Sequence, residues 1–406
     1  MIVGAGPAGA VAGIVLARAG ARVRLLDRAT FPRDKLCGDT INPGTLAALR
    51  RLGVAAEIER RALRVGGMIL TGEQRVTIEG RYPRGLHGCA IVRRDLDALL
   101  LEAAVAAGCE FESGVVVQRP VVDASRGGPT VTGVVVGGTD ASCTLPARIV
   151  VAADGRRSVV AFTLRAARHP AHPRRWAVGA YFENFAPRWG LTPTASDRGG
   201  MGVRPQGSVS TLGEMHVRRT CYIGVAEVPG GLTNVCLVKP SRPADPDLRD
   251  PRALLLRELA EDSMLCSRAS DARLAAPPVV LGPLAVDVNP PALEGLLLAG
   301  DAAGFIDPMT GDGLHFAVRG GELAAQAALQ ALEHGWTGVH ARLARERRRA
   351  FAGKWRFNRL LRALVASPRA IDAATIAGRL APRAFESIIA RAGDCHRTER
   401  EAFGER

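Results

Sequence analysis

The sequence of 406 residues is poor in aromatic side chains, has no long hydrophobic run and contains no closely spaced cysteine pair. Phe, Trp and Tyr make up only 4% of it, so the sequence does not indicate a pocket lined with aromatic rings. No run approaches the roughly 18 apolar residues that a membrane span requires. The eight cysteines form no C-x-x-C pair and no Cys/His spacing that suits zinc, so we expect a cytoplasmic protein without a metal site.

Lysine is scarce as well, because Lys35, Lys239 and Lys354 are the only three among 54 basic residues. The basic residues outnumber the 40 acidic ones and give a net charge of +14. So strong a preference for arginine is explained more simply by codon composition than by a polyanionic partner, and we expect no nucleic-acid binding. A hydrophobic content of 47% is enough for two or three subdomains around substantial cores.

The N-terminus carries a dinucleotide-binding pattern, Gly4-x-Gly6-x-x-Gly9, in which Pro7 and Ala8 fill the last two open positions. It lies between an apolar start and an amphipathic run, residues 8–19, that predicts a helix. Gly4 permits a tight turn, Gly6 lets the backbone approach a pyrophosphate, and Gly9 lets the helix pack closely. The free N–H groups at the helix start predict a pyrophosphate site.

A second predicted strand, residues 22–26, ends in Asp27 and is followed by Arg28. An acid roughly twenty residues beyond the glycines would accept hydrogen bonds from the adenosine ribose, which favours FAD or NAD over a 2′-phosphorylated cofactor. Only three residues precede Gly4, whereas a first strand normally has about five. Either this strand is clipped or the true start lies upstream.

Four further segments resemble the geranylgeranyl reductase family of flavoproteins, within the group similar to p-hydroxybenzoate hydroxylase. The segment from Phe31 to Asp39 is similar to its "P-x-x-K-x-C-G" pattern, and Arg93-x-x-Leu96-Asp97-x-x-Leu100 is similar to "R-x-x-F-D-x-x-L". Asp154-Gly155 matches a D-G turn of the group, and residues 300–313 match its last FAD motif. The resemblance covers some 330 residues.

The resemblance implies FAD as the cofactor, with NADH or NADPH as a donor that binds transiently because there is only one G-x-G-x-x-G. Arg93 would contact the phosphate or ribitol, Asp154 would hold a turn beside the cofactor, and Asp301 would accept from the ribityl hydroxyls. Amides from Gly311 to Leu314 would face the flavin N1–C2 region. The full set of expected FAD-binding residues is Gly4, Gly6, Pro7, Ala8, Gly9, Asp27, Arg28, Lys35, Cys37, Arg93, Asp154, Gly155, Gly300, Asp301, Pro308, Gly311, Asp312, Gly313 and Leu314.

Four residues are candidates for catalysis: Cys37, Gly38, Asp39 and His315. The resemblance implies that Cys37 lies close to the isoalloxazine ring, although a buried cysteine also acts as a small hydrophobe. Asp39 and His315, like Asp307 and Asp312, are candidates for assisting protonation. The alternative for His315 is a packed structural residue on a helix.

The resemblance predicts a FAD-dependent oxidoreductase that acts on a hydrophobic small molecule. Two chemistries stay open: monooxygenation through a flavin C4a-hydroperoxide, and hydride reduction of a carbon–carbon double bond as in geranylgeranyl reductases. The aromatic "Y-x-W-x-F-P" stretch of polyprenyl reductases is replaced here by residues 199–205, and the "W-x-W-x-I-P" segment of flavin-dependent halogenases is missing. A non-catalytic FAD-binding or redox-sensing protein is the alternative.

The predicted fold is α/β, with a discontinuous Rossmann-type FAD-binding domain, an inserted and mainly antiparallel substrate sheet, and a helical C-terminal region. The FAD-binding domain is expected at 1–64, 86–170 and 281–335, the substrate domain at 65–85 and 171–280, and the helical region at 336–406. Strand-like runs at 214–228 and 232–239, joined by Pro229-Gly230-Gly231, predict a hairpin.

Arginines gather between residues 342 and 362, among apolar residues at roughly helical spacing. One interpretation is a basic amphipathic helix that contacts a membrane surface. The other is a helix that packs its apolar stripe on the domain. The sequence leaves the oligomeric state open.

Overall fold

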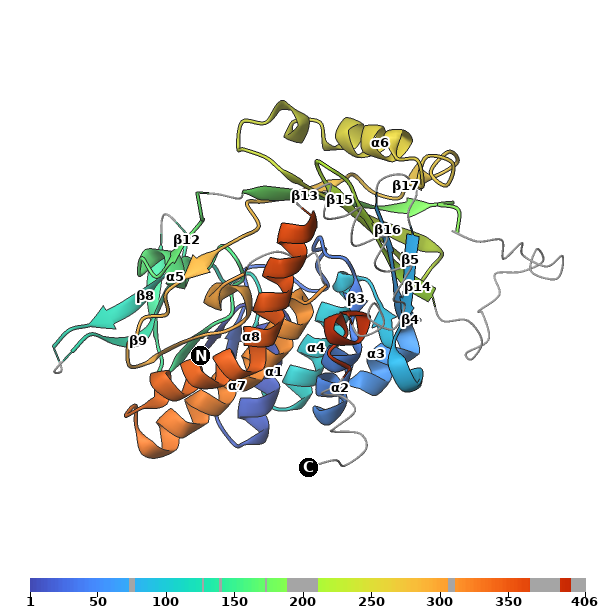
Figure 1. Ribbon diagram of the computed structural model, residues 1–406. Coiled ribbons are helices and arrows are strands. Elements are labelled where there is room, and N and C mark those ends of the chain that lie inside the picture. Colours follow the sequence, from blue (N-terminus) through green and yellow to red (C-terminus); the bar gives the residue numbers. More distant parts are fainter. Residues whose placement is uncertain are drawn as a thin grey trace.

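A five-stranded parallel sheet forms the centre of the first half of the fold (Figure 1). The computed structural model describes residues 1–72, 77–125, 128–138, 141–171, 174–187, 211–305, 311–365 and 388–395. The strand order β20-β11-β1-β2-β7 brings the N-terminal strand to the middle, between segments that are distant in the sequence. These strands are β1 (Ile2–Val3), β2 (Arg24–Leu26), β7 (Glu110–Glu112), β11 (Val150–Ala152) and β20 (Leu296–Leu298).

Helices pack on this sheet and share one apolar core. Helix α1 contacts both α4 and α7, and Ile14, Leu100 and Ala324 are almost completely buried where these helices meet the sheet. The helices are α1 (Pro7–Arg18), α2 (Pro43–Arg51), α3 (Ala55–Arg61), α4 (Arg93–Ala106), α7 (Gly313–His334) and α8 (Val339–Val365).

A ten-stranded sheet lies beside the half built on the parallel sheet, which the sequence predicts to bind FAD and which we call the FAD-binding half. It lies on the right of Figure 1 and has the order β17-β13-β16-β15-β14-β4-β6-β3. Strands β18 and β5 pair with β13 and β4, and β14 pairs with β4 in parallel. Helix α6 (Pro251–Glu261) covers its outer face. The strands are β3 (Thr40–Ile41), β4 (Leu63–Thr71), β5 (Thr77–Arg81), β6 (Gly88–Ala90), β13 (Arg175–Glu183), β14 (Thr211–Val217), β15 (Tyr222–Val228), β16 (Leu232–Pro240), β17 (Arg273–Leu274) and β18 (Val279–Leu281).

Two small sheets complete the described part of the chain. One is an antiparallel meander and the other a strand pair. Their strands are β8 (Val117–Asp123), β9 (Thr130–Gly137), β10 (Ser142–Pro146), β12 (Ala167–Arg168) and β19 (Asp287–Val288), and the short helices of the fold are α5 (Val159–Thr163), η2 (Pro83–Gly85), η4 (Pro246–Leu248) and η5 (Gly300–Ala303).

The predicted fold class is confirmed, and so is the hairpin, in which Val228 pairs with Leu232 across the turn between β15 and β16. The prediction of a single strand-like run at 214–228 is wrong. It consists of β14 and β15, separated by a tight turn in which the Arg218 amide donates to the Cys221 carbonyl over 2.9 Å. Strand β6, from a segment predicted in the FAD-binding domain, pairs with β4, and the domain boundaries stay a prediction.

The C-terminal basic helix forms as α8, and apolar residues of its first half are already covered. Val339, Leu343 and Phe351 are buried in the core shared with α7. Membrane contact through this half of the helix would therefore depend on its arginines. Among the described helices, none combines the length and apolar character needed to cross a membrane. Residues 199–205, Asp307 and Pro308 lie outside the described residues.

Candidate active site

The loop between β1 and α1 is so tight that two of its positions require glycine. Gly4 has a φ of +97°, and a Cβ there would lie 2.5 Å from the Ala153 carbonyl oxygen. A Cβ on Gly9 would lie 1.8 Å from the Gly4 carbonyl oxygen, so only glycine lets α1 approach the loop this closely.

Gly6 differs from its two neighbours because the space in front of it is open. A Cβ there would meet only the Arg33 Nη2 atom, at 3.4 Å. Gly6 is the N-cap of α1 and no side chain caps the helix, so its first amides are available to an anion. Arg33 was not predicted from the sequence, although it lies inside the "P-x-x-K-x-C-G" segment, where a basic residue facing a phosphate could have been suspected.

Two arginines share one buried acid beside this loop. Asp97 accepts from Arg93 Nε over 2.9 Å and lies 3.2 Å from Arg33 Nη2. Both Arg93 and Asp97 are buried. Burial opposes the charge on Arg93, but Asp97 outweighs it and raises the pKa of Arg93. The pair thereby fixes Arg33 opposite Gly6.

Lys35 adds a third cation to the same place. Its Nζ lies 3.9 Å from the position of a Cβ on Gly155, which has a φ of +82°. Burial lowers the pKa of Lys35, and Arg93 lowers it further, whereas Asp301 opposes the change. Burial likewise raises the pKa of Asp301, against the effect of Lys35, Arg93 and Arg156. Cations in such excess over acids suit a pyrophosphate.

Asp27 and Asp154 have very different environments. Asp27 accepts from the Ala5 amide over 2.8 Å and from the Ala29 amide over 2.9 Å, which leaves lone pairs for further donors. Asp154 is half-buried, and neither of its buried carboxylate oxygens has a hydrogen-bond partner. Burial raises the pKa of Asp154, and the nearby Ser158 side chain and the amides of Val159 and Val160 oppose it without completing a hydrogen bond. Such an orphaned carboxylate indicates a missing donor. Arg28, in contrast, is exposed.

The segment around Gly300 joins the FAD-binding half to α7. Gly300 has a φ of +58°, and a Cβ there would lie 2.8 Å from the Ala8 Cβ. Asp312, at the start of α7, accepts from Lys354 Nζ over 2.7 Å and from Asn42 Nδ2 over 3.1 Å. The Asp312 carboxylate is therefore engaged by α8 and by the start of α2, and only the backbone of 311–314 stays a candidate for FAD contact.

The residues present fit FAD. Open space at Gly6, an uncapped helix start, the converging Arg33, Lys35 and Arg93, and the orphaned Asp154 are all features that a bound dinucleotide would satisfy. The individual residue assignments stay predictions.

Cys37, Gly38 and Asp39 form a loop that joins the FAD-binding half to the ten-stranded sheet. Asp39 is completely buried and has a φ of +55°. Its Oδ2 accepts from the Tyr181 hydroxyl over 2.6 Å and from Asn234 Nδ2, and its Oδ1 accepts from the Arg93 amide over 3.2 Å. Asn234 also donates to the Cys37 carbonyl over 2.8 Å. The loop is thus held from both halves of the fold.

These contacts do not offset the effect of burial on the pKa of Asp39. Burial raises the pKa of Asp39 to about 6, although Tyr181, Asn234 and Arg93 oppose the shift. Tyr181 and Asn234 were not predicted from the sequence. They lie directly opposite each other on β13 and β16, and such cross-strand pairing cannot be read from residues more than 50 positions apart.

His315 lies in a different environment from this loop. It is buried against Phe316 and Phe351, with ring centroids 6.1 Å away in both cases, and its Nε2 lies 3.7 Å from Asp394. This placement fits the alternative of a packed structural residue.

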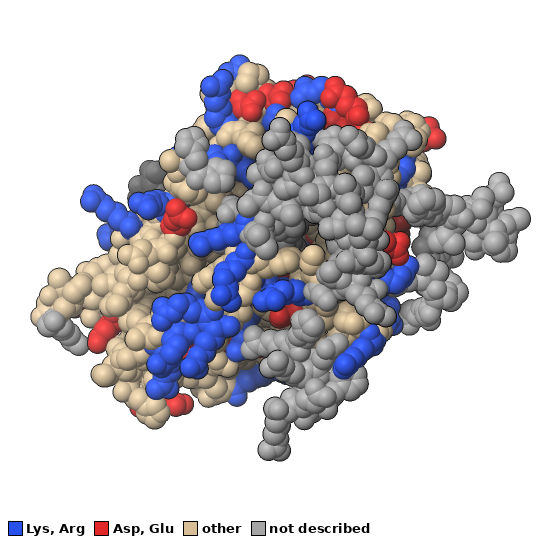
Figure 2. All heavy atoms as spheres, viewed as in Figure 1, with Lys and Arg blue, Asp and Glu red and all other residues tan. Residues whose placement is uncertain are grey.

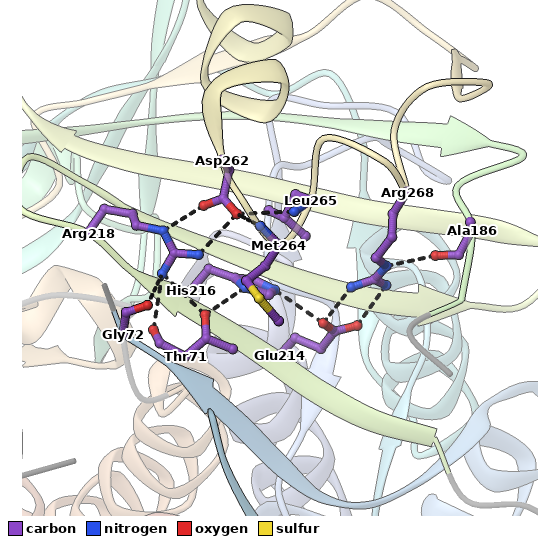
Figure 3. A network of polar contacts seen from close by, with 10 residues as sticks. All are labelled: Thr71, Gly72, Ala186, Glu214, His216, Arg218, Asp262, Met264, Leu265 and Arg268. Atoms are coloured by element: carbon purple, nitrogen blue, oxygen red, sulfur yellow. Dashed lines mark hydrogen bonds and ion pairs between the residues drawn. The ribbon is translucent and has the colours of Figure 1, made fainter. Parts of the chain in front are cut away.

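A second polar cluster lies on the outer face of the ten-stranded sheet, under α6 (Figure 3). Glu214 accepts from Arg268 over 2.7 and 2.9 Å, and its Oε2 lies 3.1 Å from the Nε2 of the buried His216. Arg218 donates to both oxygens of Asp262. Met215 and Val217, which alternate with these residues along β14, pack on the inner face with Leu36. This cluster therefore faces away from the candidate active site.

The sequence and fold of known proteins agree with this site. Residues 1–216 match the family model described as FAD binding domain. The menaquinone reductase of Mycobacterium tuberculosis is 32% identical over 80% of this chain and 75% of its own length. The geranylgeranyl diphosphate reductase of Rhodobacter capsulatus is 30% identical over 82% of this chain and 75% of its own length. Fold and site together define a FAD-dependent oxidoreductase.

The chain belongs to the geranylgeranyl reductase family of FAD-binding proteins, which confirms the predicted resemblance. It spans only 62% of another relative, conditioned medium factor receptor 1 of Dictyostelium discoideum, at 29% identity. Among solved structures, the flavin-dependent brominase Bmp2 covers 97% of this chain with a TM-score of 0.79, and the chain covers 92% of it. At 18% identity this likeness concerns the fold alone.

Proposed function

We propose that this protein reduces a carbon–carbon double bond in a hydrophobic, isoprenoid-type molecule, with FAD as the bound cofactor. The observation that carries the proposal is the buried Asp39, an acid with a raised pKa where the FAD-binding half meets the ten-stranded sheet. The relatives named as reductases of menaquinone and geranylgeranyl diphosphate support the substrate class.

The polypeptide holds the cofactor by its phosphates. The α1 amides, Arg33 and Lys35 bind the pyrophosphate, and Arg93 fixes Arg33 through Asp97. Asp27 binds the adenosine ribose and Asp301 the ribityl chain. When bound and reduced, FAD supplies the hydride. NADH or NADPH is the expected donor, which binds only transiently because there is no second dinucleotide fingerprint in the sequence.

An apolar wall on the inner face of the ten-stranded sheet suits a hydrophobic substrate. Buried Tyr222 and Val238 form its base, and Leu36, Met215 and Phe305 are only partly buried against them. Gly224, opposite Met215, adds no side chain: a Cβ there would meet only the Cys236 carbonyl oxygen, at 3.9 Å. The Cys37–Asp39 loop borders the same wall through Leu36, whose Cδ1 fills the place of a Cβ on Gly179.

Oxygen-dependent hydroxylation is the competing function. The same FAD cradle serves both reactions, and the two differ in whether oxygen or the substrate reoxidises the cofactor. The acidic group beside the apolar wall favours reduction, because adding hydrogen across a double bond needs one hydride and one proton.

The test is anaerobic. Holoenzyme is photoreduced, mixed with geranylgeranyl diphosphate or menaquinone without oxygen, and followed by flavin absorbance in a stopped-flow instrument. The proposal expects substrate-dependent reoxidation and a product with one fewer double bond. A reduced enzyme that stays reduced with both substrates, yet hydroxylates one of them when oxygen is admitted, would overturn it.

A further inference from the structure

Tyr181 and Asp39 form a pair of titratable groups of which only one can meet a ligand. Their oxygens lie 2.6 Å apart, between β13 of the ten-stranded sheet and the Cys37–Asp39 loop. Asp39 is completely buried, whereas Tyr181 is only partly buried. A molecule that reaches this pair on the inner face of the sheet can therefore contact Tyr181 but not the carboxylate of Asp39.

The hydrogen bonds describe one protonation state of this pair. Tyr181 and Asn234 both donate to Oδ2, and the Arg93 amide donates to Oδ1, so Asp39 is present as the acceptor in every contact. A proton on Oδ2 would reverse the bond to Tyr181. Asp39 would then donate to the tyrosine oxygen, and the tyrosine O–H would be released to point at a ligand.

We propose that Tyr181 is the proton donor of the reduction and that Asp39 is the acid that resupplies it. The inference rests on the proposed function. One carbon of the double bond takes the hydride, and the other takes the Tyr181 proton, with the π electron pair forming the second C–H bond. The carboxylic proton of Asp39 moves to the tyrosine oxygen as its O–H bond breaks. Asp39 remains as a carboxylate that accepts from Tyr181, as in the structure, and regains its proton from solvent.

The groups around the pair set the direction of its pH dependence. Cys37 lies on the same loop, Arg93 begins α4, Tyr181 is on β13, and Asn234 and Cys236 are on β16. Burial raises the pKa of Asp39 to about 6 and that of Cys236 to about 12. The active form has a protonated Asp39, so the rate of the reductive step should fall as pH rises through about 6.

The test compares Tyr181→Phe with Tyr82→Phe in photoreduced holoenzyme mixed anaerobically with geranylgeranyl diphosphate. Tyr82 belongs to the same apolar cluster as Tyr181 but is not among the donors to Asp39, and it packs against the segment around Gly393. Loss of a general acid is expected to slow substrate-dependent reoxidation of the flavin by roughly 10²-fold or more in Tyr181→Phe. Tyr82→Phe should keep the wild-type rate and its decline with pH.

A second readout does not depend on turnover. In oxidised holoenzyme labelled with ¹³C at the aspartate carboxyls, Asp39 should titrate near 6, and Asp39→Asn assigns its signal. Tyr181→Phe removes a donor that stabilises the carboxylate, so its midpoint should move upward. Tyr82→Phe should leave the midpoint unchanged.

The outcomes separate the two proposals. A wild-type enzyme that reduces neither geranylgeranyl diphosphate nor menaquinone would contradict the proposed function. A wild-type enzyme that reduces one of them, together with a Tyr181→Phe variant of equal rate and unchanged pH profile, overturns the role of Tyr181 alone. An Asp39 midpoint that does not move in Tyr181→Phe also overturns it, because the two groups would then not be coupled.

Discussion

The two faces of the ten-stranded sheet carry two polar clusters built from similar residues. On the outer face, Glu214 faces His216 and is bound by the two terminal guanidinium nitrogens of Arg268 (Figure 3). On the inner face, Asp39 receives neutral donors, the hydroxyl of Tyr181, the amide of Asn234 and a backbone N–H. Asp39 is completely buried and the Glu214 side chain is only 9% exposed, and both accept at least three hydrogen bonds or close contacts.

The difference lies in the charge of the partners. Burial alone would raise the pKa of Glu214, but His216 and Arg268 outweigh it and lower that pKa to about 2. Without a bound cation, burial raises the pKa of Asp39 to about 6. A fully paired acid stays ionised and holds the fold together, whereas an acid held by neutral donors can exchange a proton near neutral pH. The comparison assigns stability to the outer face and chemistry to the inner one.

The largest effect on the free energy of unfolding is expected for Arg268→Met. The substitution leaves Glu214 buried without its cation, which typically costs about 3–5 kcal/mol. Chemical denaturation monitored by circular dichroism measures the loss. The control is Arg257→Met, which breaks an exposed pair with Asp247 and should cost below about 1 kcal/mol. Equal losses in the two variants would contradict the structural role of the outer cluster.

A smaller effect, of opposite sign on the two faces, is expected from pH. Asp39 ionises at about 6 when folded and near 3.8 when unfolded, so its contribution is complete below about 4 and is lost as pH rises through 6. The stability advantage of wild type over Asp39→Asn should therefore shrink by about 2–3 kcal/mol between pH 4 and 7.

Glu214 should behave in the reverse way in the same denaturation series. Its pKa is lowered from 4.5 to about 2, so its contribution is present above 4.5 and is lost as pH falls toward 2. The advantage of wild type over Glu214→Gln should decline in acid. If the stability advantage of wild type over both variants declined at the same end of the pH range, the contrast between the two faces would be wrong.

Little change in stability, but loss of the cofactor, is expected for Gly6→Val. The backbone of Gly6 is extended and a Cβ there would meet only Arg33, so the apoprotein should fold within about 1 kcal/mol of wild type. The valine would occupy the pyrophosphate path, and flavin absorbance per protein should fall below a tenth of the wild-type value. Normal flavin content would contradict the assignment of this loop. Gly9→Val, which would meet the Gly4 carbonyl at 1.8 Å, should instead fail to fold.

The smallest effect concerns arginines that, unlike those on the outer face, have no acid beside them. Figure 2 shows basic side chains gathered over α8, and its exposed Arg342, Arg345, Arg349 and Arg356 form no ion pair with residues that the structure describes. We expect weak, salt-sensitive cosedimentation with anionic vesicles. Each replacement of an arginine by glutamine should weaken the free energy of binding by about 1 kcal/mol. Replacing the ion-paired Arg60 gives the control. Equal binding to neutral vesicles would contradict an electrostatic contact.

Local features of this molecule were predictable from sequence, and its long-range pairings were not. The spacing of Gly4, Gly6 and Gly9 determines a turn and a helix start within nine residues, and the structure has both. The resemblance also indicated Asp39 as a candidate. It could not indicate Tyr181, because the contact depends on the register of β13 and on a loop 142 positions earlier.

The one wrong strand prediction and one missed contact have the same origin. The run at 214–228 is apolar enough for one strand, and it is divided at Arg218, whose guanidinium is held by Asp262 and the Thr71 carbonyl from distant parts of the chain. The contact between Asp312 and Lys354, one of only three lysines, was not predicted either, because the two residues lie 42 positions apart. Partners so far apart are decided by tertiary packing.

The most direct test of the account is one anaerobic turnover in D₂O. Photoreduced holoenzyme is mixed with geranylgeranyl diphosphate, and the product is analysed by mass spectrometry and NMR. The account predicts a product in which both carbons of each reduced double bond carry deuterium, because the hydrogen that reduced flavin transfers also exchanges with solvent, with the yield declining as pD rises in wild type and collapsing in Tyr181→Phe. A product that contains oxygen only after air is admitted, or recovery of unchanged substrate from fully reduced enzyme, would contradict it.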